Sequence, residues 1–216
     1  MASGLPGLPV LPGVRVVVAT GNAGKLAEFR HLLADTGLDL VAQGELGITD
    51  VEETGVSFVE NALIKARHAS RESGLPALAD DSGLLVAALA GAPGLHSARY
   101  AGPGANDRAN IDRLLAALSG QHGTERRRAS FYACLVLVRA GDDPLPVIAE
   151  GWWPGHILDA PVGSGGFGYD PVFFDPEQGQ SAAQMPAPMK SRISHRARAV
   201  AALCTRLADP QILPLA

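Results

Sequence analysis

Two adjacent carboxylates, Asp80 and Asp81, stand at the end of an apolar run in the sequence LPALADDSGLLVAAL. Ser82 and Gly83 follow them directly, and Asp, Ser and Gly are frequent in tight turns because they cap or relax the local backbone. We therefore predict a buried strand that ends in a turn at the acidic pair. Carboxylates at such a turn can hold Mg²⁺ at the mouth of a cleft. They also occur in turns without chemistry, and this stretch alone does not choose between the two.

A second candidate is the segment from Val18 to Lys25, VATGNAGK, which reads as the end of a strand, a turn and the start of a helix. Glycines let a backbone approach an anion, and the N–H groups of a helix start supply positive potential. A Walker A loop would need glycine where Ala19 stands and Ser or Thr where Leu26 stands. The segment is therefore a phosphate-binding turn of another type, or a plain connection.

The third candidate is the glycine-rich stretch GSGGFGYDP, from Gly163 to Pro171. It matches G-x-G-x-x-G, but a dinucleotide fingerprint follows a strand and opens a helix, whereas an extended YDPVFF sequence follows here. We therefore reject a dinucleotide fold. Phe167 and Tyr169 beside Asp170 favour a lid that stacks on a base, a contact worth roughly 1–3 kcal/mol per base. The alternative is a turn whose aromatic rings fill the core.

The fourth candidate is the basic segment KSRISHR, from Lys190 to Arg196. It places His195 and Arg196 in the first turn of a helix, where cations oppose the helix dipole. That local cost predicts an anion or a polar ligand nearby. The alternative is a solvated basic patch.

Strands and helices alternate around these candidates. Phe58, Ala62 and Ala66 give the helix over 57–73 an apolar side, while Asn61 and Lys65 share a polar face with His68 that is expected to meet solvent. Ser57 and Glu60 would form a capping box at its start. An acidic loop with Glu52 and Glu53 precedes it. We predict strands over 14–20, 38–42, 129–139 and 145–153, and helices over 25–34, 57–73, 106–119 and 194–207.

The composition describes an α/β protein. The chain has 216 residues, 47% of them hydrophobic, and a net charge of −4, which argues against disorder and against a protein that coats duplex nucleic acid. Residues 1–13 read as a flexible leader, and residues 14–216 as a single domain. No apolar run reaches the length of a membrane span. Two distant cysteines in apolar segments suit a reduced cytoplasmic protein. Neither G-x-S-x-G nor a zinc-binding spacing is present.

Taken together, these stretches resemble the inosine triphosphate pyrophosphatase family, the Ham1-like XTP/dITP diphosphatases. The resemblance extends from Val14 to about Leu207. Six blocks in family-like order carry it: ATGNAGK with Glu28 following, EETGVSFVENALIKARHA, LADDSGL, GAPGLHSARYAG, GGFGYDPVFF and SHR.

The resemblance implies a fold and an activity. It implies a long central mixed sheet flanked by helices, in two lobes with the nucleotide cleft between them, and a homodimer. It also implies Mg²⁺-dependent hydrolysis of ITP, dITP and XTP to the nucleoside monophosphate and pyrophosphate. The partner is then a small nucleotide, with no polymeric nucleic acid and no membrane.

Carried over by position, the resemblance also implies site residues. Asp81 would be the general base and would hold Mg²⁺ together with Glu52 or its neighbour Glu53. The triphosphate and other substrate contacts would come from Thr20, Gly21, Asn22, Ala23, Gly24, Lys25, Lys65 and Ser82. The nucleoside contacts would come from Phe167, Gly168, Tyr169, Asp170, Lys190, His195 and Arg196.

The chain departs from the family pattern just before the last block. Members commonly carry acidic residues before the lysine of that block, whereas MPAPM precedes Lys190 here. A pyrophosphatase of the related Maf type, acting on pyrimidine or methylated nucleotides, is a second interpretation. A nucleotide-binding module without hydrolysis is a third. The pairing of GGFGYDP with SHR favours the purine enzyme.

Overall fold

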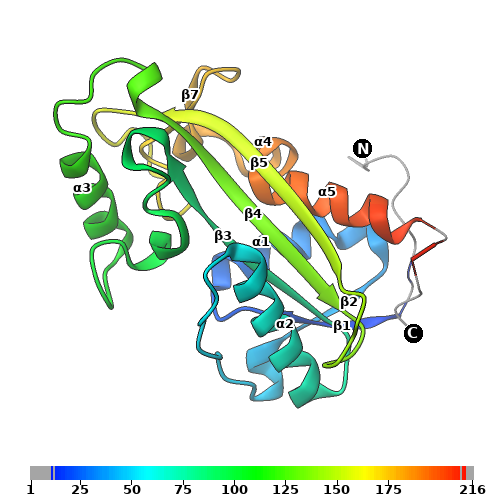
Figure 1. Cartoon of the computed structure of the whole chain (residues 1–216). Helices are drawn as coiled ribbons and strands as arrows, with labels where there is room; N and C mark the ends of the chain where they lie inside the picture. The colour runs from blue at the N-terminus through cyan, green and yellow to red at the C-terminus, as the bar shows by residue number, and fades with distance from the viewer. Residues whose placement is uncertain (1–10, 12, 210, 213–216) are drawn as a thin grey trace. The chain divides into compact units, whose positions relative to one another are not determined.

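The structure is a computed structural model that describes Leu11, residues 13–209 and residues 211–212. Most of the predicted leader, residues 1–10 and 12, lies outside these. The elements, in chain order, are β1 Arg15–Ala19, α1 Ala23–Leu32, β2 Asp39–Ala42, α2 Phe58–Ser73, β3 Ala77–Val86, α3 Asp107–Ala117, β4 Arg128–Val138, β5 Val147–Ile157, β6 Phe173–Asp175, β7 Gln180–Ser181, α4 Ala187–Ile193 and α5 His195–Leu207 (Figure 1).

One mixed sheet joins the strands in the order β2-β1-β3-β4-β5-β6-β7. β1 pairs in parallel with β2 and β3, and β6 pairs antiparallel with β5 and β7. The predicted class, a mixed sheet flanked by helices, is confirmed.

The chain divides into two compact units. The first comprises the residues up to Asp81, residues Ala133–Gly151 and the residues from Arg196 onward, and the second comprises Ser82–Tyr132 and Trp152–His195. β3, β4 and β5 each contribute residues to both units.

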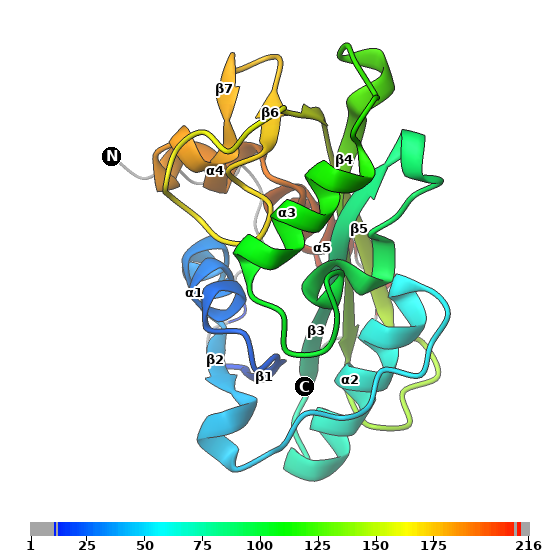
Figure 2. The ribbon, with the colours of Figure 1, turned by 90° about the vertical axis from the view of Figure 1, so that its left-hand side faces the viewer.

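In the first unit, helices cover both faces of the strands. Val16, Val18 and Leu78 pack in one core cluster with Phe29 of α1 and Leu203 of α5. Because side chains alternate along a strand, the neighbouring positions face the other way. That other side is covered by α2, and Figure 2 shows α1 and α2 on opposite sides of β1 and β3.

The sequence of α2 explains its fit. Ser57 caps the helix, its hydroxyl contacts the Glu60 carboxylate at 2.8 Å, and Gly74 ends the helix in the left-handed conformation. The predicted helix and its Ser57 cap are confirmed: the Ser57 Oγ accepts from the Glu60 N–H at 3.4 Å, and the Glu60 carboxylate accepts from the Val56 N–H at 2.9 Å. Ala62 and Ala66 are fully buried, and such small side chains let α2 lie close to the sheet.

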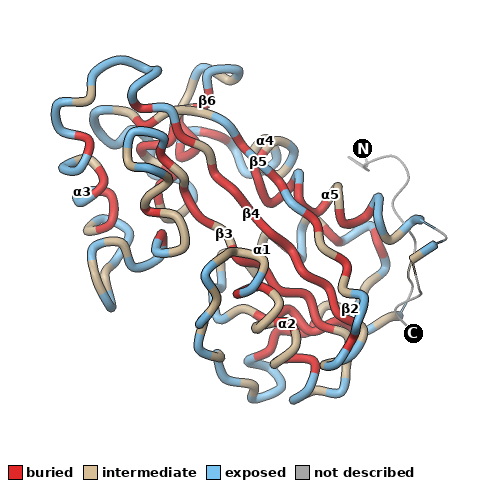
Figure 3. Tube along the Cα trace, viewed as in Figure 1, coloured by how far each residue is buried: buried red, intermediate tan, exposed pale blue. Residues whose placement is uncertain are grey.

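The second unit has an aromatic core. Trp153 and Phe173 are fully buried beside Phe131, and their ring centroids lie 4.5–6.0 Å apart. Leu114 of α3 packs in the same cluster. Figure 3 shows that β3 and β4 are buried along most of their length.

The predicted turn at Asp80–Gly83 is wrong. β3 continues without interruption from Ala77 to Val86, and both aspartates are buried within it. Turn-forming residues can remain in a strand when their polar groups find partners there. Lys25 and Arg196 are the partners of Asp80, and Lys65 is a partner of Asp81. The sequence did not predict the helix α4, which follows Pro186 and carries Pro188 in its first turn, where the missing N–H of proline costs no helical hydrogen bond.

Among the residues that the structure describes, no helix is both long enough and apolar enough to cross a membrane.

Candidate active site

Asp80 lies in a buried cluster of charges within the first unit. Its side chain is 0% exposed, and its Oδ2 accepts from Lys25 Nζ at 2.8 Å and from Arg196 Nη2 at 3.2 Å. Arg196 also pairs with Glu28 of α1 through Nη1. The two cations and two carboxylates balance in formal charge, which is what allows them to be buried together. The cluster joins β3 to α1 and α5.

The cations keep Asp80 ionised. Burial by itself would raise the pKa of Asp80, but the adjacent Lys25 and Arg196 outweigh it and hold that pKa well below the ordinary 3.8. Burial likewise tends to lower the pKa of Arg196, and Asp80 with Glu28 outweighs it and raises that pKa. Asp80 is therefore a permanent anion and a poor proton acceptor.

Asp81 faces the opposite side of the strand, toward α2. Its Oδ2 accepts from Asn61 Nδ2 at 3.2 Å, and its Oδ1 lies 3.4 Å from Lys65 Nζ. Lys65 also donates to Glu53 Oε1 at 2.8 Å and to the Asp80 carbonyl at 2.9 Å. Asn61 is 2% exposed, so Asn61 and Lys65 meet carboxylates where solvent was the ordinary expectation, whereas His68 of the same face contacts the Thr49 carbonyl.

Asn61 fixes the acidic loop as well as Asp81. Its Oδ1 accepts from the Gly55 N–H at 2.8 Å. A Cβ at Gly55 would lie 2.7 Å from that oxygen and 2.6 Å from Glu60 Cβ, so only glycine lets the loop approach α2 this closely. The contact holds the loop that carries Glu53 against the helix.

Asp81 has the opposite electrostatic character to Asp80. Burial raises the pKa of Asp81, and the charges of Glu53 and Asp80 add to that rise while Lys65 opposes it. For Lys65, burial lowers the pKa, but Asp81 and Glu53 outweigh it and raise the pKa. A carboxylate with a raised pKa is the better proton acceptor of the two.

The structure separates the two glutamates of the acidic loop. Glu53 is half-buried and shares the Lys65 ammonium with Asp81, whereas Glu52 is exposed. No group of three or more His, Cys, Asp or Glu side chains in the described part of the chain is arranged to hold a metal ion.

The predicted phosphate turn is the exposed start of α1. Asn22 caps the helix, with its Oδ1 accepting from the Lys25 N–H at 3.0 Å, and its own N–H donates to Thr20 Oγ1 at 3.1 Å. Ala23 and Gly24 follow as the first helical residues, whose N–H groups have no partner within a helix. Exposed N–H groups at a helix start suit an anion.

The remaining predicted contacts, Ser82 and the nucleoside set without Arg196, belong to the second unit. Ser82 is half-buried in β3. Asp170 accepts from the Phe167 N–H at 3.0 Å and pairs with Lys190, whose Nζ lies 5.1 Å from the centre of the Phe167 ring. The glycine-rich loop is therefore an organised turn that presents Phe167.

The loop is held at further points. Burial raises the pKa of Tyr169, so its hydroxyl stays protonated and donates to the Ser97 carbonyl at 2.8 Å. At Gly166, with φ of 73°, a Cβ would lie 1.9 Å from Asp170 Oδ2, which only glycine avoids. Tyr169 is 4% exposed and fills the core, as one interpretation of the sequence expects, whereas Phe167 is half-buried and its stacking on a base stays a prediction.

His195 and Arg196 are neighbours in sequence but belong to different units. His195 is 6% exposed, and its ring stacks on Phe131 at 4.8 Å and an interplanar angle of 13°. Of the basic segment, His195 and Arg196 are therefore buried and Lys190 pairs with Asp170, whereas Arg192 is exposed.

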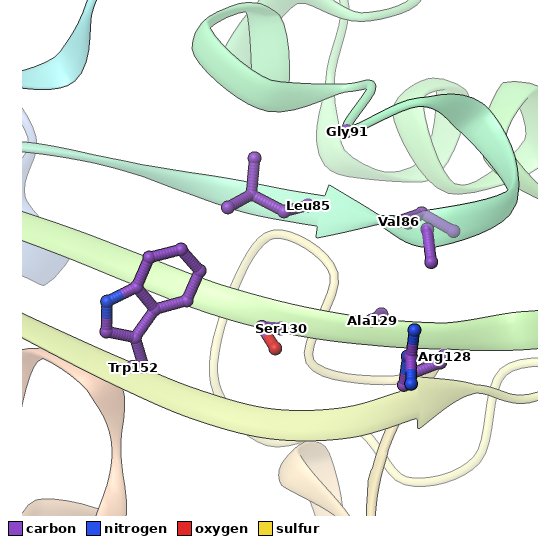
Figure 4. Close-up of a pocket in the computed structure, with 8 residues that line it drawn as sticks. Leu85, Val86, Gly91, Arg128, Ala129, Ser130 and Trp152 are labelled. Carbon is purple, nitrogen blue, oxygen red and sulfur yellow. The ribbon is translucent and has the colours of Figure 1, made fainter. Parts of the chain in front are cut away.

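An open apolar pocket of about 190 Å³ also lies in the second unit, and Figure 4 shows it. Leu85 and the half-exposed Trp152 flank it, with Arg128 and Ser130 beside them. None of the predicted site residues lines it.

The sequence indicated Asn61 and Glu28 only weakly. Its spacing places Asn61 on the face of Lys65, four residues away, where solvent exposure is the ordinary expectation. Glu28 belongs to a family-like block without an assigned role there.

Comparison with known proteins identifies the family. The Ham1 family profile matches residues 16–206, which is most of the chain. The chain belongs to the Ham1 family.

Similar Ham1-family sequences carry a common name. A dITP/XTP pyrophosphatase from Xanthomonas campestris is 60% identical over 192 residues, which cover 89% of this chain and 96% of that protein. One of the same name from Methylococcus capsulatus is 58% identical over 193 residues, with the same coverage. The family predicted from the six blocks is therefore confirmed.

Solved structures agree with the fold. A HAM1 protein from Coxiella burnetii matches with a TM-score of 0.83 and 46% identity, covering 90% of this chain and 98% of that one. A nucleoside-triphosphatase / dITP/XTP pyrophosphatase from Mycobacterium abscessus matches with a TM-score of 0.71 and 43% identity, covering 88% and 98%. The Ham1 fold thus extends over nearly the whole described chain.

Proposed function

We propose that this Ham1-family chain is a nucleoside triphosphate pyrophosphatase. It hydrolyses ITP, dITP and XTP at the bond between the α- and β-phosphates and so removes deaminated purines from the nucleotide pool. The names of the relatives support the substrate class. The observation that carries the chemistry is Asp81, a buried carboxylate of raised pKa held beside Lys65 and Glu53.

We assign binding of the triphosphate to Lys25, Lys65 and the exposed turn from Thr20 to Gly24. The turn offers backbone N–H groups at a helix start, and the two lysines offer full charges. Ser82, which follows Asp81 directly, is proposed as a further substrate contact.

We assign Mg²⁺ binding to Asp81 and, of the two candidate glutamates, to Glu53. Glu53 and Asp81 already share one cation, the Lys65 ammonium, so the two carboxylates converge where a hard cation is favoured. Mg²⁺ is commonly held by one or two carboxylates together with substrate phosphates and water. A protein cluster of three ligands is therefore not needed. When bound, Mg²⁺ would neutralise phosphate charge and assist departure of pyrophosphate.

We assign separate roles to Asp81, Asn61 and Asp80. Asp81 orients the attacking water and accepts its proton, a role worth about 10²–10⁴-fold in rate. Asn61 holds one oxygen of that carboxylate, which leaves its direction fixed. Asp80, kept ionised by Lys25 and Arg196, supports the strand and accepts no proton.

We assign contacts with the nucleoside to the residues from Phe167 to Asp170 and to Lys190, His195 and Arg196. Phe167 would stack on the base. Hypoxanthine and xanthine present an acceptor at position 6, where adenine presents an amino donor. Donors directed at that position would lose their partner with adenine, at a cost of roughly 1–3 kcal/mol for each unmatched group.

The test is to measure pyrophosphate and single-phosphate release from ITP with Mg²⁺, for the wild-type chain and for Asp81→Asn. Pyrophosphate release by the wild type and its loss in the variant support the proposal. A preference for dUTP or methylated triphosphates over ITP and XTP would support a Maf-type enzyme instead. Tight ITP binding without any release would support a binding module.

We further propose that the chain forms a homodimer in the cytoplasm, with neither a membrane nor polymeric nucleic acid as partner. The net charge of −4 argues against a protein that coats duplex nucleic acid, which would ordinarily be basic. Light scattering on the purified chain should give twice the mass of one chain, and the mass of one chain would contradict the dimer.

A further inference from the structure

The glycine-rich loop of the second unit is tied to α3 by one carboxylate. The Gly168 N–H donates to Asp107 Oδ2 at 2.6 Å, across 61 residues of sequence. Figure 2 shows the loop beside the start of α3. Asp107 is the first residue of α3 but not its cap, because Asn106 accepts from the Ala109 N–H at 2.9 Å. The Asp107 carboxylate is thus available to the loop.

The start of α3, which carries Asp107, is held in place by hydrogen bonds of Asn110. Asn110, one turn further along α3, accepts from the Ala101 N–H at 2.8 Å and donates to the Ala98 carbonyl at 3.2 Å. Asn110 is 3% exposed. These contacts fix the start of α3 to the segment that precedes it, so a group held by Asp107 is held by the body of the second unit.

The loop needs such an anchor because it is rich in glycine. Gly163, Gly165, Gly166 and Gly168 leave its backbone with more conformational freedom than other residues would. Asp170 holds the Phe167 N–H from within the loop itself, whereas Asp107 holds the next N–H from outside. Two carboxylates therefore fix the peptide groups on either side of the Phe167 Cα, which limits the directions of the Phe167 ring.

We propose that Asp107 is a positioning residue that orients Phe167 for stacking on the purine base. Asp107 touches no substrate and acts through the Gly168 N–H. The inference rests on the proposed function, because it needs a nucleoside that stacks on Phe167. Since the base lies away from the bond that is cleaved, loss of the anchor raises KM and changes kcat little.

The experiment compares three variants of the full chain: Asp107→Ala, Asp107→Asn and Asp112→Ala. Asn keeps an acceptor oxygen for Gly168. Asp112 lies on the same helix, is half-exposed and pairs with Arg108, so its variant is a control for lost charge on α3. For each we measure ITP kinetics, thermal unfolding and hydrogen exchange of the peptide over 163–170.

Asp107→Ala should speed exchange over 163–170 and raise KM for ITP roughly tenfold, the size expected for one lost hydrogen bond to a charged group, with kcat within about twofold. Asp107→Asn should recover most of both values, and Asp112→Ala should leave both unchanged.

Unchanged loop exchange or unchanged KM in Asp107→Ala would overturn the proposal, and so would an equal effect of Asp112→Ala. If Asp107→Ala does not fold, the test rests on Asp107→Asn. Wild-type exchange and wild-type KM in a well-folded Asp107→Asn support the anchor. Faster loop exchange in Asp107→Asn without a rise in KM overturns the proposal. A wild-type chain that is inactive on ITP would contradict the proposed function. The exchange measurement would still decide whether Asp107 anchors the loop.

Discussion

Asp80 and Asp81 are adjacent, chemically identical and both buried, yet their surroundings are opposite. Asp80 faces α1 and α5 and meets the cations Lys25 and Arg196, which lower its pKa. Asp81 faces α2, where burial and the nearby Glu53 raise its pKa in spite of Lys65. The difference arises because successive side chains of a strand point to opposite faces. Asp80 is thereby kept ionised, and Asp81 is the better proton acceptor of the two.

This contrast shows how a pair of carboxylates can divide two tasks. A carboxylate that holds several elements together must stay charged at every working pH, whereas a general base works best when its pKa lies closer to that pH. Both properties are set by the helices that pack on each face of β3.

The largest expected effect is on turnover. Asp81→Asn should lower kcat for ITP at least about 100-fold while the melting temperature changes little, since the amide keeps the size of the side chain but accepts no proton. Steady-state kinetics and a thermal melt on the same sample test this. A rate within a few-fold of wild type would remove Asp81 from the chemistry.

The second prediction concerns the neighbouring Asp80, where the main expected loss is in stability and not in turnover. Asp80→Asn should destabilise the chain by about 3 kcal/mol, because it leaves Lys25 and Arg196 buried without the anion that they share. Urea unfolding of both Asn variants in parallel measures the difference. Equal losses of stability would mean that the two carboxylates are not distinct in this respect.

The third prediction concerns the metal. Glu53→Gln should raise the Mg²⁺ concentration for half-maximal rate roughly tenfold, which corresponds to about 1.4 kcal/mol of binding. The adjacent Glu52→Gln is the matched control and should leave it unchanged, because Glu52 is exposed. Mn²⁺ titration followed by electron spin resonance measures binding independently of turnover. A larger effect at Glu52 would transfer the ligand role to it.

The smallest effect is a pair of opposite pH slopes, measured without divalent metal. With its pKa lowered in the fold, Asp80 contributes stability that is complete above about pH 4 and is lost as the pH falls below its ordinary 3.8. With its pKa raised, Asp81 makes the free energy of unfolding fall as the pH rises above 3.8. Each Asn variant should remove its own slope, and slopes of the same sign would contradict the contrast.

Much of the fold could be predicted from local pattern. Ser57 and Asn106 specify the starts of two helices through short-range hydrogen bonds to the backbone. The apolar spacing of α2 specifies the side of the helix that is buried. Both helices are present in the structure. The six blocks likewise identified the family. The turn predicted at Asp80–Gly83 is wrong because partners from distant parts of the chain outweigh the turn preferences of the residues in the stretch and keep both aspartates in β3.

The sequence by itself determined the family and the class of fold, because these follow from local preferences and from motifs in order, and it named the candidate site residues. Only the tertiary structure decided which aspartate meets cations and which meets Lys65 and Glu53. It also decided that Glu53, and not Glu52, stands beside Asp81, and that Asp107 holds the loop of Phe167. Those outcomes depend on residues far apart in the chain, whose electrostatic effects exist only once the helices have packed on the sheet.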